Sequence, residues 1–89
     1  MAYIVRLSRA AKRALAVELS EAVAAACVEF IYGPLAENPL RVGKQLTPPL
    51  WPRYSARRGE FRIVYGILEA EVIVEVVSIQ HRRDVYRPR

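Results

Sequence analysis

The spacing of apolar and polar residues divides the first third of the chain into a strand and two helices. "YIVRLS" alternates apolar and polar side chains, which predicts a strand over residues 3–7. Ser8 is a suitable N-cap for a helix over about 9–19, where apolar residues recur at every fourth position. A second helical pattern starts after Ser20. Two helices joined by so short a link predict a helical hairpin.

A proline-rich segment follows this hairpin. Gly33-Pro34 predicts the end of the second helix, because glycine suits a C-cap and proline cannot donate the next helical hydrogen bond. Residues 33–53 hold five of the six prolines and predict a packed loop, with one short turn around Leu35–Glu37. We expect Trp51, which is surrounded by prolines, to anchor this loop on the core.

After residue 53 the pattern changes to a period of two. "YSARR" predicts a short strand, and Gly59 marks the turn that follows it. "FRIVYGIL" predicts the next strand, with four apolar residues on the side facing the helices: Phe61, Ile63, Tyr65 and Ile67. Arg62 therefore faces away from the core. "LEAE" predicts a turn of undefined type, and the nearly continuous valines of "VIVEVVSI" predict a central strand covered on both faces.

These elements predict an α+β fold of order β-α-α-β-β-β, in a single domain over residues 1–89. The last three strands form an antiparallel meander, and the first strand pairs within the same small sheet. The two-helix hairpin packs on one face. The opposite face stays open and carries the arginines.

The charged residues point to a binding function, because the positive residues are clustered and nearly all of them are arginines. The chain has 14 Lys and Arg against 9 Asp and Glu, and only two of the cations are lysines. Residues 41–62 and 81–89 are strongly basic and contain aromatic residues. The planar guanidinium binds phosphate bidentately and stacks on bases. The alternative is an ordinary solvated surface, and composition alone favours nucleic acid only slightly.

The remaining composition limits the compartment. No apolar run approaches the roughly 20 residues of a membrane-spanning helix, and the N-terminus lacks the pattern of a secretory signal. The single cysteine, Cys27, cannot form an internal disulfide and lies at helical core spacing. We therefore expect a cytoplasmic protein without a membrane partner, in which Cys27 is an inert core residue.

Three stretches resemble a known family. "RVGKQL", "YSARRGEFRIVYGI" and a valine-rich strand closed by "HRRDVY" look like the RelE side of the RelE/ParE superfamily of bacterial toxins. The resemblance covers residues 3–87, and its most specific parts are "GEFRIVY" and "HRRDVYR". It implies a RelE-like fold, ribosome-dependent cleavage of mRNA in the A site, no cofactor, and inhibition by a cognate acidic, RelB-like antitoxin.

The resemblance also implies roles for individual residues. Arg62 matches an arginine at the scissile phosphate, and Arg82 a second phosphate-clamping arginine. Tyr86 matches a tyrosine that stacks on a base near the cut and helps position the 2′-hydroxyl. His81 matches a position where a histidine could act as general acid, since an imidazole titrates near neutral pH. The expected RNA-binding residues are Lys44, Arg53, Arg57, Arg58, Arg83 and Arg87.

The chemistry implied is metal-free attack of the 2′-hydroxyl on the adjacent phosphorus, since no carboxylate or Cys/His set in the sequence suits a metal. Gln45 lies in the region where some relatives carry a glutamate base, so the general base is left open. Two alternatives are a ParE-like toxin that binds DNA gyrase without catalysis, and a catalytically weak module that only binds RNA or an antitoxin.

Overall fold

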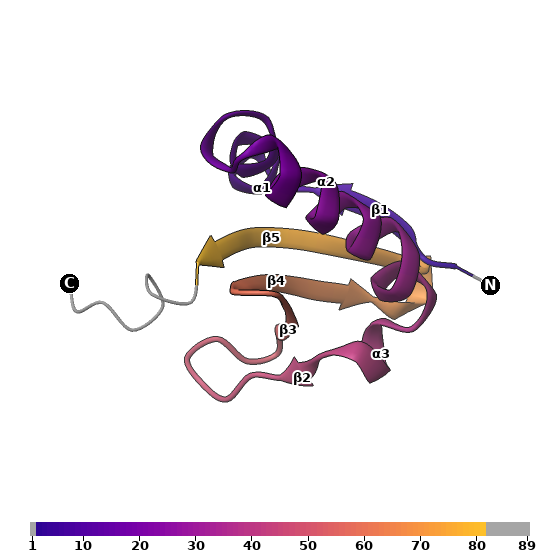
Figure 1. Ribbon diagram of the computed structural model, residues 1–89. Coiled ribbons are helices and arrows are strands. Elements are labelled where there is room, and N and C mark those ends of the chain that lie inside the picture. Colours follow the sequence, from indigo (N-terminus) through magenta and orange to yellow (C-terminus); the bar gives the residue numbers. More distant parts are fainter. Residues whose placement is uncertain (1, 82–89) are drawn as a thin grey trace.

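The computed structural model describes residues 2–81 and has an α+β architecture (Figure 1). The strands are β1 (Ile4–Leu7), β2 (Lys44–Gln45), β3 (Tyr54–Arg58), β4 (Phe61–Leu68) and β5 (Ile73–His81). The helical elements are α1 (Arg9–Arg13), η1 (Ala14–Glu18), α2 (Glu21–Phe30), η2 (Ile31–Leu35), α3 (Pro39–Val42) and η3 (Glu69–Glu71). The predicted fold class is confirmed.

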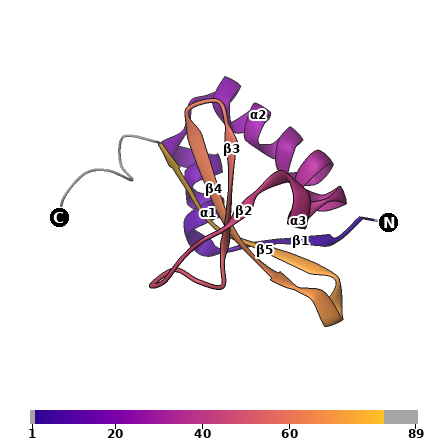
Figure 2. The ribbon, with the colours of Figure 1, turned by 90° about the horizontal axis from the view of Figure 1, so that it is seen from below.

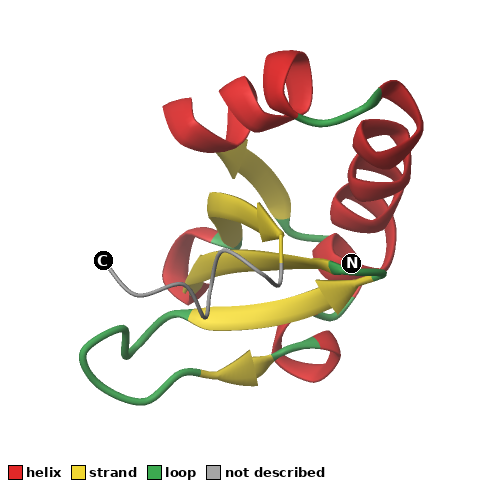
Figure 3. Cartoon of the chain, turned by 60° about the vertical axis from the view of Figure 1, so that its left-hand side comes forward, coloured by secondary structure: helices red, strands yellow, loops and turns green. Residues whose placement is uncertain are grey.

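One five-stranded sheet organises the chain, in the order β1-β5-β4-β3-β2. β3, β4 and β5 form the predicted antiparallel meander, and β1 pairs in parallel with β5. β2 is an edge strand that the sequence did not predict; it pairs antiparallel with β3. In Figure 1, α1 and α2 lie together beside β1 and β5, and α3 lies beside β2 at the other edge of the sheet. The loop between β2 and β3 projects away from α1 and α2 (Figures 1 and 3).

The core lies between the helices and the sheet. Its members from β4 are Ile63 and Tyr65, as the alternation predicted, and both are fully buried. We call this side of the sheet the helix face. The side that bears Arg62 is the open face; strand register places Lys44, Ser55, Arg57, Arg62 and Gln80 there.

A β-bulge interrupts the alternation of side chains in β5. Val64 pairs with Ser78 and Tyr65 with Val76, so Val77 is an extra residue in β5. Val76 and Ile79 consequently both face the core although they are three positions apart. The Val77 carbonyl accepts a 2.6 Å hydrogen bond from the Ser8 hydroxyl, which also caps α1 at the amide of Ala11. The bulge thus joins the last strand to the start of α1.

The predicted helix end at Gly33-Pro34 is wrong. The helix continues through both residues as a π-helical turn to Leu35. In a regular α-helix the ring of Pro34 would collide with the carbonyl four residues earlier, and the wider π turn relieves that collision. The continued helix buries the side chains of Ile31 and Leu35, which are both 0% exposed. Full burial of a side chain of this size stabilises the folded state by about 1.5–3 kcal/mol.

Gly59 provides the tight turn between β3 and β4, at the end of the hairpin in Figure 2. Its φ is +63°, a left-handed conformation that costs other residues about 1–2 kcal/mol. We expect Gly59→Ala to lower the free energy of unfolding by about that amount in urea denaturation. Gly33→Ala is the matched control, because Gly33 has open space and no positive φ; equal midpoints for the two variants would contradict this account.

Candidate functional site

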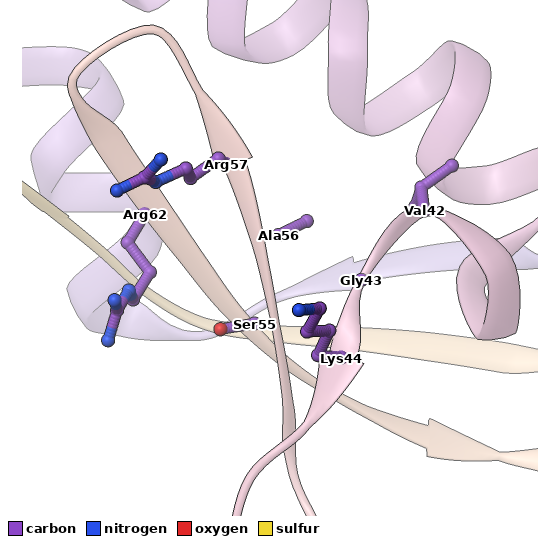
Figure 4. A pocket seen from close by; sticks show the side chains of 7 residues that line it. All are labelled: Val42, Gly43, Lys44, Ser55, Ala56, Arg57 and Arg62. Atoms are coloured by element: carbon purple, nitrogen blue, oxygen red, sulfur yellow. The ribbon is translucent and has the colours of Figure 1, made fainter.

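The candidate site is a hollow of about 350 Å³ at the junction of β2, β3 and β4 (Figure 4). It is lined by Val42, Gly43, Lys44, Ser55, Ala56, Arg57 and Arg62. We call it the basic hollow. Figure 4 shows one cationic side chain from each strand: Lys44 from β2, Arg57 from β3 and Arg62 from β4. Residues 18 positions apart along the chain are thus brought to one place.

The two arginines of the basic hollow are direct cross-strand partners. Arg57 pairs with Arg62, and the neighbour of Arg62 on β5 is the uncharged Gln80. Like charges opposite each other destabilise a sheet. Among residues 2–81, neither of the two ion pairs involves Lys44, Arg57 or Arg62. An unfavourable charge pair kept without a carboxylate partner in the described chain is typical of a site that binds an anion.

Close packing behind the basic hollow positions Lys44. Gly43 precedes Lys44, and a Cβ added to Gly43 would lie 2.3 Å from the Tyr65 hydroxyl oxygen and 2.7 Å from the Ser55 carbonyl oxygen. The Tyr65 hydroxyl donates a 2.5 Å hydrogen bond to the carbonyl of Pro39 at the start of α3. The bare backbone of Gly43 therefore lets β2 approach β3, which holds Lys44 over the open face.

The Tyr65 hydroxyl in this packing makes the stability of the fold depend on pH. Burial, and secondarily the neighbouring Tyr54, raises the pKa of Tyr65 to about 12. The folded state therefore favours the neutral phenol, and the stability it contributes is complete below pH 10 and is lost as pH rises toward 12. Tyr65→Phe should cost about 1–3 kcal/mol at pH 9, because the Pro39 carbonyl loses its donor.

The difference in unfolding free energy between wild type and Tyr65→Phe should then shrink by about 1 kcal/mol between pH 9 and pH 11. Urea denaturation at the two pH values measures this directly, and the other tyrosines cancel in the comparison. A difference that stays constant across this range would contradict the assigned direction of the pKa shift.

His81 and Arg58 do not join the basic hollow. His81 pairs with Phe61 across β4 and β5, and the two rings meet edge to face with centroids 5.1 Å apart. The His81 Nε2 also lies 3.7 Å from a carboxylate oxygen of Glu60. Arg58 lines a separate hollow with Cys27 and Phe61. Both residues are therefore on the helix face, across the sheet from Arg62.

The remaining predicted site residues lie elsewhere. Arg53 lines a third hollow, beside Gln45, Tyr54 and Ile67. Arg82, Arg83, Tyr86 and Arg87 lie outside the described residues. Of the predicted RNA-binding and catalytic residues that lie within residues 2–81, three are brought together in the basic hollow: Lys44, Arg57 and Arg62. Gly43 and Ser55 were missed, although the alternation of "YSARR" already placed Ser55 on the same face as Arg57.

Other titratable groups form no second cluster in the described chain. Within residues 2–81, no three His, Cys, Asp or Glu side chains gather as metal ligands would. Cys27 is buried, as predicted, and this burial raises the pKa of its thiol despite the opposing charge of Arg58. No helix in this part of the protein combines the length and apolar character needed to cross a membrane.

Comparison with known proteins identifies the family. Residues 2–86 match the family model of the ParE toxin of the type II toxin-antitoxin system parDE. Toxin RelE of Mycobacterium tuberculosis (strain ATCC 25618 / H37Rv) is 46% identical over 85 residues, which covers 96% of this chain and 87% of that protein. Toxin RelG of the same strain is 42% identical over 87 residues, covering 98% and 99%.

The fold agrees with these sequence relationships. The structure of the toxin-antitoxin complex RelBE2 from Mycobacterium tuberculosis contains a chain that superposes with a TM-score of 0.87 at 40% identity. The superposition covers 92% of this chain and 93% of the other. The resemblance drawn from the sequence motifs is confirmed: the chain belongs to the RelE family of type II toxin-antitoxin toxins, within the wider RelE/ParE superfamily.

Proposed function

We propose that this toxin is a ribosome-dependent endoribonuclease that cleaves mRNA in the A site. The observation that carries the proposal is the basic hollow, where cations from three strands meet without a carboxylate among the lining residues. Such a site fits a phosphodiester, whose negative charge increases during cleavage. A site for a neutral ligand would have no need of the facing arginine pair.

The proposed reaction uses the RNA's own 2′-hydroxyl as nucleophile. It attacks the adjacent phosphorus and loses its proton to a base; the bond from phosphorus to the 5′-oxygen breaks, and an acid protonates that oxygen. Arg57 and Arg62 stabilise the charge on the phosphorane oxygens, and Lys44 holds the neighbouring backbone. The products are a 2′,3′-cyclic phosphate and a 5′-hydroxyl. No carboxylate of residues 2–81 lines the basic hollow, so we assign the role of base to no residue of this part of the chain.

His81, Arg82 and Tyr86 belong to this proposal through the family resemblance. Because His81 lies on the helix face, it can act as general acid only if its side chain reaches around the end of β5. Arg82 is proposed as a second phosphate clamp and Tyr86 as a base-stacking residue. We place this cleavage in the cytoplasm, where ribosomes are engaged.

An acidic antitoxin is the second proposed partner. The related RelBE2 structure is that of a toxin-antitoxin complex. An acidic segment that neutralises the basic hollow would block the access of RNA, since complementary charge favours both association and specificity. Competition between such a segment and RNA follows from the excess of five positive charges on the chain.

Purified toxin added to programmed ribosomes tests the proposal. We expect cuts within the A-site codon, with 2′,3′-cyclic phosphate and 5′-hydroxyl ends, and no cuts in the same mRNA without ribosomes. The matching family model is named for ParE, so inhibition of gyrase supercoiling is measured in parallel. Intact mRNA together with inhibited supercoiling would replace this function with the gyrase-directed one.

A further inference from the structure

Trp51 lies on the surface of the protein and not in its core. The prediction that it packs on the core is wrong: its side chain is 60% exposed, and it is absent from the residues packed against the core cluster. Its neighbour Leu50 is 48% exposed. Both belong to the loop between β2 and β3, which projects from the body of the domain (Figures 1 and 2). Its exposed ring is available for a contact outside the chain, and an aromatic ring offers a flat face on which a base can stack.

The loop is held in shape by its own backbone. The amide of Leu50 donates to the Thr47 carbonyl at 3.1 Å, and the amide of Arg53 donates to the Leu50 carbonyl at 3.0 Å. The side-chain amide of Gln45 donates to the Pro52 carbonyl at 3.3 Å. Three prolines restrict the backbone further. An indole presented by an ordered loop binds at a smaller entropic cost than one on a floppy segment.

Charge around the loop favours nucleic acid over protein or lipid as the partner. Residues 38–59 contain no Asp or Glu and five cations: Arg41, Lys44, Arg53, Arg57 and Arg58. Trp51 is thus an exposed aromatic residue in a segment that has cations and no carboxylate. Aromatic side chains interleaved with cations are the arrangement that binds single strands, since bases stack on the ring while cations contact the phosphates.

The loop is also connected directly to the basic hollow. It joins β2 to β3, and both strands contribute lining residues: Lys44 on one side, Ser55 on the other. Trp51 is six residues from Arg57, so their Cα atoms are at most about 22 Å apart. An RNA strand held at Arg57 and Arg62 can therefore reach the indole a few nucleotides away.

We propose that Trp51 is a base-stacking residue that binds an unpaired nucleotide of the RNA next to the segment held in the basic hollow. The inference deepens the proposed endoribonuclease function and rests on it. Trp51 contributes to binding the RNA and takes no part in bond breaking. It extends the RNA-binding surface beyond the sheet, to a loop for which the sequence predicted only a structural part.

Fluorescence provides a direct test, because Trp51 is the only tryptophan of the chain. The probe is an unstructured RNA of about 12 nucleotides with 2′-deoxy substitutions that prevent cleavage. We expect its binding, followed by anisotropy of a labelled strand, to quench the tryptophan. Trp51→Ala should weaken binding by roughly 5- to 150-fold, the loss of one stacked base, and Trp51→Phe should retain most of the affinity. Leu50→Ala, the exposed neighbour, is the control and should bind like wild type.

Binding without quenching, or equal affinity of Trp51→Ala and wild type, would overturn the inference. Programmed ribosomes give a second readout: Trp51→Ala should raise the toxin concentration for half-maximal cleavage and leave the maximal rate unchanged. If wild type neither binds the oligonucleotide nor depends on Trp51 at the ribosome, the inference is also wrong. Quenching and Trp51-dependent binding without any mRNA cleavage would instead contradict the proposed function and leave the stacking role standing.

Discussion

Replacing Arg62 by alanine is expected to reduce mRNA cleavage on programmed ribosomes by roughly 100- to 1000-fold. Arg62 comes from β4 with its partner Arg57 opposite on β3. In the proposed reaction this pair stabilises the charge that develops on the phosphorane. Arg62→Lys should recover only part of the rate, because an ammonium cannot grip two phosphate oxygens as a guanidinium does. Single-turnover rates with excess toxin measure the effect without a contribution from binding.

Arg13→Ala is the matched control for Arg62→Ala. Arg13 is an exposed arginine at the end of α1, where it pairs with Glu18 at 3.3 Å, and it does not line the basic hollow. Such a surface pair contributes at most about 1 kcal/mol to stability. Arg13→Ala should therefore cleave like wild type. Equal rates for Arg62→Ala and Arg13→Ala would mean that the basic hollow does not hold the scissile phosphate.

Gly43→Ala is expected to lower the free energy of unfolding more than the other single substitutions considered, Gly59→Ala and Tyr65→Phe. The added methyl group would overlap the Tyr65 hydroxyl and the Ser55 carbonyl, and relief of that overlap would break the hydrogen bond from Tyr65 to Pro39. Overpacking and an unpaired buried carbonyl together cost about 2–4 kcal/mol. For a domain of this size, the midpoint of thermal unfolding should fall by roughly 10–30 °C.

Gly66→Ala is the control for this substitution. Gly66 lies in β4, where an added Cβ meets nothing within 4 Å, so its replacement should leave the unfolding midpoint nearly unchanged. The double variant Gly43→Ala/Tyr65→Phe should be less destabilised than the sum of its single changes, because the removed hydroxyl is one of the colliding groups. A Gly43→Ala protein as stable as wild type would contradict the close packing of β2 on β3.

Period-two alternation was sufficient to predict much of the site. The pattern of "FRIVYGIL" placed Ile63 and Tyr65 in the core and Arg62 on the opposite face, as the structure has them. The same parity, continued along "YSARR", puts Arg57 beside Arg62. Side chains alternate strictly in a strand with one buried face, so the face of each residue follows once a single apolar position is known.

The alternation of faces could also have assigned His81 to the helix face, but only if β5 were known to extend as far as His81. His81 is two positions after Ile79, and both residues face the helices. The bulge at Val77 shifts the alternation earlier in β5, and nothing in a run of valines reveals where the extra residue falls. The candidate catalytic residues His81 and Arg62 are therefore on opposite faces of the sheet, a division that the motif "HRRDVY" alone does not reveal.

The segment over residues 33–53 resisted prediction because long-range packing decides its structure. Gly33-Pro34 is a local signal for a helix end, and the burial of Leu35 overrides it. β2 is two residues long, too short to carry a period, and exists because β3 offers it an edge. Whether Trp51 packs inward depends on the path of the loop, which hydrogen bonds such as that from Gln45 to Pro52 determine.

Inducible expression in a bacterium, followed by mapping of mRNA 5′ ends, tests most directly whether the basic hollow holds RNA for cleavage. The strains compared express wild type, Arg57→Ala/Arg62→Ala and Arg13→Ala. We predict growth arrest with new 5′ ends in translated codons for wild type and Arg13→Ala, and neither effect for the double variant. New ends of equal abundance in all three strains, or arrest by wild type with its mRNA intact, would contradict the account.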